Sequence, residues 1–74
     1  MRKDLIYDKK FPNLEYAIEN SGRTAEALAD LIGISPLSMW RKRIGKTDFT
    51  VIEAINLKNN LRTSLSVEEL FKEA

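Results

Sequence analysis

The chain has 74 residues, enough for one small domain, and a formal net charge of +1. It has no cysteine, which excludes disulfides and thiolate metal sites, and no histidine, the usual general base near neutral pH and the commonest metal ligand. No apolar run approaches the roughly 20 residues of a membrane span. We expect a soluble, cytoplasmic, all-helical domain that does not bind membranes.

Residues 1–12 follow no regular pattern. The apolar run 5–7 and Phe11 are set among lysines and aspartates, which fits an extended arm, a short strand or an extra helical turn. Two roles stay open for this segment: a tail anchored by one or two side chains, or an arm that contacts phosphates or a second copy of the chain. We therefore divide the chain into an N-terminal arm, 1–12, and a folded domain, 13–74.

A first helix is expected to begin near Pro12 or Asn13. It should end at 20–22, where the sequence reads Asn-Ser-Gly. Tyr16 is expected to lie half-buried on its flank. Residues at helical spacing form its inner stripe: Leu14, Ala17, Ile18 and Ser21.

The segment 24–46 predicts two short helices joined by a tight corner. Thr24 can cap the first helix, and Gly33 can end it because only glycine enters the left-handed conformation without steric cost. Ser35 can cap the second helix, with Pro36 in its first position, where no amide hydrogen is needed. One apolar stripe runs along the first of these helices: Ala25, Leu28, Ala29 and Ile32. Two helices with such a corner are the sequence form of a helix-turn-helix.

The charge distribution singles out the second of these helices and the loop after it. Residues 36–47 carry four bases and no acid, whereas residues 1–35 hold five bases and six acids, and residues 48–74 hold three bases and five acids. The excess positive charge of a nearly neutral chain is thus placed on one segment. Its bases are Arg41, Lys42, Arg43 and Lys46.

Two further helices are predicted from capping boxes, in which the cap hydroxyl and an acid three residues later satisfy each other's backbone amides. Thr50 with Glu53 begins one helix that runs to about Asn60, and Ser66 with Glu69 begins a short last one. The longer helix is apolar enough around its circumference to suggest packing on two sides. The residues that suggest this are Val51, Ile52, Ala54, Ile55 and Leu57.

In this order, these phrases resemble the Cro/repressor-like helix-turn-helix family of phage and bacterial regulators. The resemblance covers about Asn13 to Phe71. The phrases that carry it are Asn13-Leu14, Gly22-Arg23-Thr24, Leu28-Ala29, Ile32-Gly33-Ile34-Ser35, 45–50 (Gly-Lys-Thr-Asp-Phe-Thr) and 65–71 (Leu-Ser-Val-Glu-Glu-Leu-Phe). The family implies an all-α, lambda-repressor-like bundle of about five short helices, operator DNA as the ligand, and usually a homodimer.

The resemblance also implies where DNA contacts would fall: on the start of the second helix and the exposed face of the third. Those positions are Thr24, Ala25, Pro36, Leu37, Ser38 and Arg41, with Lys46 just beyond. The chain departs from the family pattern at Ala25, where glutamine is common, at Ile44, where asparagine is common, and at Arg43, where leucine is common. Pro36 and Leu37 replace polar residues; their apolar atoms cannot donate to a base edge, but they can contact a thymine methyl group.

Arg41 is the residue we expect to read a base, because a guanidinium can bond to guanine O6 and N7 together. The alternatives are a phosphate contact or a solvated arginine. Ser38, on the same face, is a weaker candidate. Lys42, Arg43 and Lys46 are expected to contact the sugar-phosphate backbone, unless they form an ordinary solvated face.

Two neighbouring residues on the third helix have structural roles to decide. Met39 is expected in the core. Trp40 is expected there too, or else at the edge of the DNA face, stacked on a sugar or on an arginine.

Enzymatic activity is not expected. The carboxylates are spread over exposed helical faces, and none pairs with a plausible nucleophile. No phosphate loop, catalytic residue, metal-ligand spacing, cofactor motif or small-molecule site is evident.

The sequence therefore predicts a sequence-specific double-stranded DNA-binding regulator, phage- or prophage-derived, that represses by occupying its operator. A homodimer is expected, with Leu61, Phe71 or the N-terminal arm as candidate contacts. The alternative is an antirepressor-like protein-interaction module on the same fold, which would use Pro36, Leu37 and Trp40. The exposure of the four bases discriminates between them, and an inward ion pair by Arg41 or Arg43 weakens the DNA hypothesis.

Overall fold

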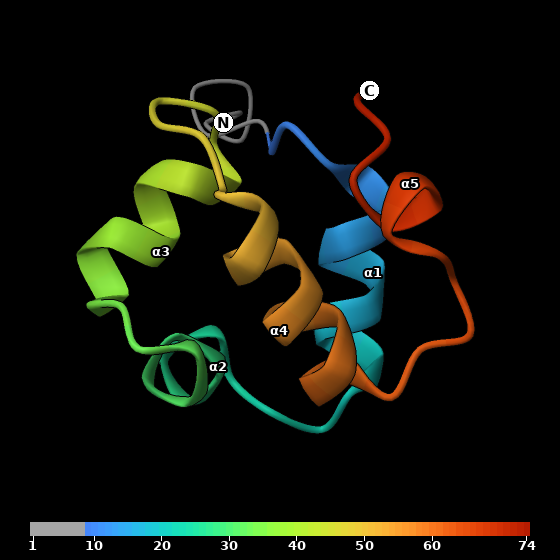
Figure 1. Ribbon diagram of the computed structural model, residues 1–74, viewed down its shortest axis with the longest axis horizontal. Coiled ribbons are helices and arrows are strands. Elements are labelled where there is room, and N and C mark those ends of the chain that lie inside the picture. Colours follow the sequence, from blue (N-terminus) through green and yellow to red (C-terminus); the bar gives the residue numbers. More distant parts are fainter. Residues whose placement is uncertain (1–8) are drawn as a thin grey trace, which may run out of the picture.

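The computed structural model describes residues 9–74, and within that range the chain is a bundle of five short helices without strands. The expected all-α fold is confirmed. The helices are α1 (Pro12–Asn20), α2 (Ala25–Ile32), α3 (Pro36–Arg43), α4 (Val51–Leu61) and α5 (Val67–Leu70) (Figure 1). α2 packs against α3 and α4, and α5 packs against α1 and α4.

The predicted N-terminal caps are present on four helices. The hydroxyl of Thr24 accepts a hydrogen bond from the amide of Ala27 at 3.0 Å, and that of Ser35 accepts one from Ser38 at 3.1 Å. Both predicted capping boxes, at the starts of α4 and α5, are complete. Each cap contributes about 1 kcal/mol to the stability of its helix. These helix starts are therefore determined by residues close to them in sequence.

The corner between α2 and α3 is built on Gly33, whose φ is +82°. The next amide, of Ile34, donates to the carbonyl of Ala29 at 2.9 Å and closes the end of α2. The chain then needs only Ile34 and Ser35 before α3 begins at Pro36. A side chain at Gly33 would meet no neighbouring atom, so the left-handed backbone itself is what favours glycine there. α3 ends at Arg43, and the remainder of the basic segment is loop.

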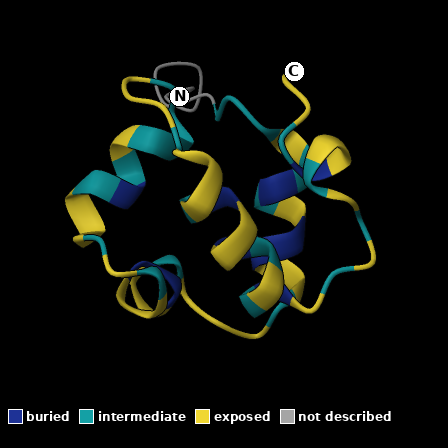
Figure 2. Cartoon of the chain, in the orientation of Figure 1, coloured by how far each residue is buried: buried dark blue, intermediate teal, exposed yellow. Residues whose placement is uncertain are grey.

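The core takes one fully buried large side chain from every helix: Leu14, Leu28, Met39, Leu57 and Leu70, in order from α1 to α5. No polar or charged residue of the described chain is buried with them. Figure 2 shows the buried positions on the inner sides of the helices. A second, aromatic cluster joins Phe11, Phe49 and Phe71, with ring centroids 5.1 to 6.1 Å apart. Met39 is thus in the core, as expected.

The two ends of the described chain are tied to the bundle. The amide of Lys10 donates to the carbonyl of Arg43 at 2.9 Å, and the amide of Ala74 donates to the carbonyl of Lys10 at 3.1 Å. Phe11 packs on the core. Lys10 and Phe11, assigned to the arm from the sequence, therefore belong to the folded domain. Pro12, the last residue of that arm, opens α1, and residues 1–8 lie outside the described residues.

Two expectations about burial are wrong. Tyr16 is exposed rather than half-buried, with 69% of its surface accessible. α4 packs on one side only: Ala54, Leu57 and Leu61 are buried, whereas its other apolar residues face outward. A helix can bury two faces only where neighbours cover both. α4 contacts α2 and α5, and the residues that it buries there all lie on one stripe. The outward residues are Val51, Ile52 and Ile55.

The contrast between the two faces of α1 gives a stability prediction. Leu14→Ala is expected to lower the free energy of unfolding by about 2–5 kcal/mol, because it leaves a cavity in the core. Tyr16→Ala, on the exposed face of the same helix, is expected to change it by about 0.5 kcal/mol or less. Urea unfolding followed by circular dichroism measures both. Similar losses for the two variants would contradict this packing.

Candidate nucleic-acid interface

α3 lies at one edge of the bundle, with one side on the core and the other side open (Figure 1). Met39 is its buried contact, and Pro36, Leu37 and Arg41 are exposed. Ser38 is half-buried, one turn before Arg41. The open side of α3 thus presents a short apolar tip followed by one arginine.

The start of α2 contributes backbone and cap groups rather than long side chains. Thr24 is exposed, and its hydroxyl oxygen is engaged as the cap of α2. Ala25 is partly buried and packs against the core. Neither side chain is long enough to reach far from the surface. Any contact by these two residues would therefore involve the Thr24 hydroxyl or the first amides of α2.

Arg43 is engaged inside the protein. Its Nη2 lies 2.5 Å from Oε1 of Glu15, and its Nε donates to Oε2 of the same carboxylate at 3.1 Å. Both side chains are mostly buried, at 16% and 21% exposed. This two-pronged pair fixes the end of α3 to α1 and holds the guanidinium away from a ligand.

Lys42 is engaged on the other flank of α3. Its Nζ lies 3.0 Å from Oε1 of Glu53 and donates to the carbonyl of Asp48 at 2.8 Å. Glu53 also accepts from the amide of Thr50, as part of the α4 capping box. Burial raises the pKa of Glu53, but the bonds from Thr50 and the charge and bond of Lys42 outweigh it, and the pKa lies below its ordinary value.

Arg41 and Lys46 are the two bases of the segment that remain exposed. Among residues 9–74 neither forms an ion pair with an acid. The amide of Lys46 donates to the carbonyl of Arg41 at 2.8 Å, so the loop folds back onto the end of α3. The structure thus places Arg41 and Lys46 together but separates them from Lys42 and Arg43. From the sequence, an inward ion pair by Arg41 or Arg43 is expected to weaken the DNA hypothesis. The pair of Arg43 with Glu15 weakens it in this way, whereas Arg41 faces outward and supports it.

Trp40 is half-buried between two cations. The Nζ of Lys9 lies 5.0 Å from the ring centroid, and the guanidinium carbon of Arg43 lies 5.9 Å from it. The indole is therefore neither a fully buried core residue nor an open stacking surface. Each of the two cations is attracted to the face of its ring.

Sequence analysis missed both acids that engage these bases. Glu15 lies 28 residues from Arg43, and Glu53 lies on another helix from Lys42. The one available signal was local: Glu53 follows Thr50 at capping-box spacing, which fixes its carboxylate at the start of α4. No comparable signal directs Glu15 toward α3.

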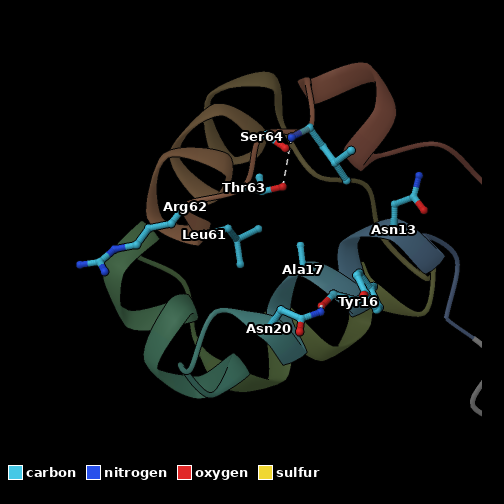
Figure 3. A pocket seen from close by; sticks show the side chains of 9 residues that line it. Asn13, Tyr16, Ala17, Asn20, Leu61, Arg62, Thr63 and Ser64 are labelled. Carbon is cyan, nitrogen blue, oxygen red and sulfur yellow. Dashed lines mark hydrogen bonds between the residues drawn. The ribbon is translucent and has the colours of Figure 1, made fainter.

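A separate hollow of about 460 Å³ lies between α1 and the loop after α4 (Figure 3). Three of its polar side chains have partners within the protein: the Asn13 amide donates to the carbonyl of Glu69, the Asn20 amide donates to the carbonyl of Tyr16, and the Thr63 hydroxyl accepts from the amide of Leu65. Arg62, with φ +56°, extends its guanidinium away from the hollow in Figure 3. The arrangement offers no convergent charge for an ionic ligand.

Within residues 9–74, no group of three or more acidic residues is placed to hold a metal ion. No helix in that part of the chain is long and apolar enough to cross a membrane. Searches with family models, among curated proteins and among solved structures each found no match to this chain. Its function is therefore argued from the geometry of α3 and its surroundings.

The lowered pKa of Glu53 predicts an acid-dependent loss of stability. In the unfolded chain the carboxylate takes up a proton near its ordinary pKa of 4.5, whereas in the folded chain it does so at lower pH. The contribution of the carboxylate is thus fully present above pH 4.5 and is lost as pH falls through the folded pKa. Glu53→Gln should reduce the difference in melting temperature between pH 7 and the acid range.

Calorimetry over this pH range measures the effect, with Glu19→Gln on the exposed face of α1 as the matched control. An unchanged pH profile for Glu53→Gln would show that the pair with Lys42 does not stabilise the fold.

Proposed function

We propose that this chain is a sequence-specific double-stranded DNA-binding regulator of the Cro/repressor type, which acts by occupying an operator. The observation that carries the proposal is the presentation of α3. Its inner residues Met39, Lys42 and Arg43 fix it to the core, α4 and α1, while its outer side stays exposed. A helix held this way, with a second helix packed across its start, fits a DNA major groove.

On this proposal the exposed residues of α3 divide into two kinds. Arg41 would bond to guanine O6 and N7, and Ser38, one turn earlier, would contact a base or a phosphate. Pro36 and Leu37, at the apolar tip, would contact thymine methyl groups. Lys46 and the start of α2 at Thr24 would contact phosphates on either side of the groove.

The internal ion pairs set a limit on the electrostatic part of binding. Salt dependence is measured as the slope of the logarithm of the binding constant plotted against the logarithm of the salt concentration. Four phosphate contacts from this segment would give a slope of about −3.6. With Lys42 and Arg43 engaged by Glu53 and Glu15, and with Arg41 assigned to a base, Lys46 alone would give a slope of about −0.9 per protomer. A homodimer on two half-sites would double this slope and supply the affinity that one small module lacks.

A second candidate function is a protein-interaction module that does not bind DNA. Two observations favour it: half of the bases in the basic segment are neutralised internally, and the tip of α3 is apolar, with Leu37 55% exposed. Such a module would bind a partner through Pro36 and Leu37, and Arg41 would then lie at the edge of the contact.

The test is selection from a random-sequence duplex library, followed by binding of the selected duplex across a salt series. Arg41→Ala is expected to lose about 5- to 150-fold in its preference for the selected over a random duplex, because one bidentate base contact is removed. Lys46→Ala should weaken both duplexes equally and reduce the salt slope. Lys72→Ala, which removes an exposed charge near the C-terminus, is the matched control and should change neither.

Absence of binding at low salt would reject the DNA proposal and favour the protein-interaction module. Equal losses of preference for Arg41→Ala and Lys72→Ala would show that α3 does not read the sequence.

A further inference from the structure

The exposed face of α4 differs from every other helix surface in the described chain because it bears no charge. All five of its exposed residues are neutral: Val51, Ile52, Ile55, Asn56 and Asn59. The other four helices each expose at least one charged residue. In a protein with 31% charged residues, the longest helix thus has only neutral residues at its exposed positions. Figure 2 shows exposed positions along the outer side of α4.

Within residues 9–74, this face also gathers more exposed large apolar residues than any other helix. Val51 and Ile52 are 74% and 71% exposed, and Ile55 is 43% exposed. The three follow one another around the outer half of α4. Large apolar residues gathered on one helix face, rather than scattered singly, are typical of a contact surface.

An apolar groove continues the surface toward α5. It has a volume of about 400 Å³ and runs between the start of α4 and the aromatic cluster, with Phe49, Val67 and Phe71 in its walls. Three charged residues also line it, away from the exposed face of α4: Lys10, Asp48 and Glu73. Val51 borders this groove and also belongs to the exposed face of α4. The exposed face of α4 and the apolar walls of this groove therefore form one continuous surface. α4 projects from this surface, and the groove is the hollow beside it.

The charge of this surface indicates its occupant. A DNA backbone requires lysine or arginine, and helices that lie on membranes carry bases along their polar face. The one base of α4, Lys58, is half-buried at the edge of this face, and the five exposed residues are neutral. In a dimer with two-fold symmetry, the same patch of both copies is in contact. A charged residue near the symmetry axis would therefore lie beside the same charge of the other copy. A neutral face avoids that repulsion, and each asparagine amide offers both a donor and an acceptor to its copy.

We propose that the exposed face of α4, from Val51 to Asn59, is the surface through which two copies of this chain pair. The proposed function requires such a dimer, and for its biological use this inference rests on that proposal. Leu61, a candidate dimer contact from the sequence, is 2% exposed and belongs to the core of its own protomer. α4 supplies the contact in its place.

The experiment is sedimentation velocity from micromolar to millimolar protein, without DNA. The wild-type chain is expected to shift from monomer to dimer as the concentration rises. Ile52→Glu should raise the dimer dissociation constant at least about tenfold, because it buries a charge against its own copy. The substitution should not unfold the chain, since an acid in the first turn of a helix is favoured by the helix dipole.

Tyr16→Glu is the matched control, because Tyr16 is as exposed as Ile52 but lies on α1. It should leave the dimer unchanged. A second variant, Ile55→Lys, introduces the opposite charge in the same face and should also produce a monomer. Circular dichroism of each variant checks that the helices are intact.

The outcomes separate this inference from the DNA proposal. A wild-type chain that stays monomeric at millimolar concentration overturns the inference, whatever its DNA binding. So does a dimer that persists in Ile52→Glu and Ile55→Lys, or one that Tyr16→Glu disrupts equally. A dimer lost only in the α4 variants supports the inference even if the chain binds no DNA.

Discussion

The candidate interface depends on the two ion pairs that attach α3 to the rest of the bundle. α3 inserts a single side chain, Met39, fully into the core. Its orientation is therefore set largely by its C-terminal half, where Arg43 binds Glu15 of α1 and Lys42 binds Glu53 of α4. The pair to Glu15 is bidentate and mostly shielded from water, so it is less screened than an exposed pair and restricts rotation of the helix.

These attachments change the meaning of the basic segment. In the sequence, four bases without an acid suggest a strongly positive surface. In the folded chain, acids from two other helices neutralise half of that charge, and Arg41 and Lys46 remain exposed. The proposed contact with DNA thus relies less on electrostatic attraction and more on shape, on one arginine, and on duplication in a dimer. The exposed face of α4 is the surface through which we propose that the dimer forms.

The parts of the fold that were predicted correctly depend on residues close together in sequence. The cap at Thr24 and the capping box at Thr50 and Glu53 each span three residues, and the corner at Gly33 needs only a left-handed backbone. Helix positions and most of the core follow from these signals and from helical spacing. The all-α class could therefore be predicted from the sequence alone.

The features that were predicted wrongly or missed depend on contacts between segments that are distant in sequence. Periodicity indicates that α4 is apolar on two sides, but it cannot tell which side the other helices cover, and Ile52 is left exposed. Tyr16 fails for the same reason. The partners of Arg43 and Lys42 were not predictable, because many acids lie on exposed faces and only the packing of α1, α3 and α4 selects Glu15 and Glu53.

The most direct test of the central claim, that α3 and the start of α2 form a DNA-binding surface, is a nuclear magnetic resonance titration. The ¹⁵N-labelled chain would be titrated with a selected duplex, and amide shifts mapped along the sequence. The account predicts the largest changes at Thr24–Ala27, at Ser35–Arg41 and at Lys46, with small changes in α5. Changes confined to α1 or α5, or none at low salt, would contradict it.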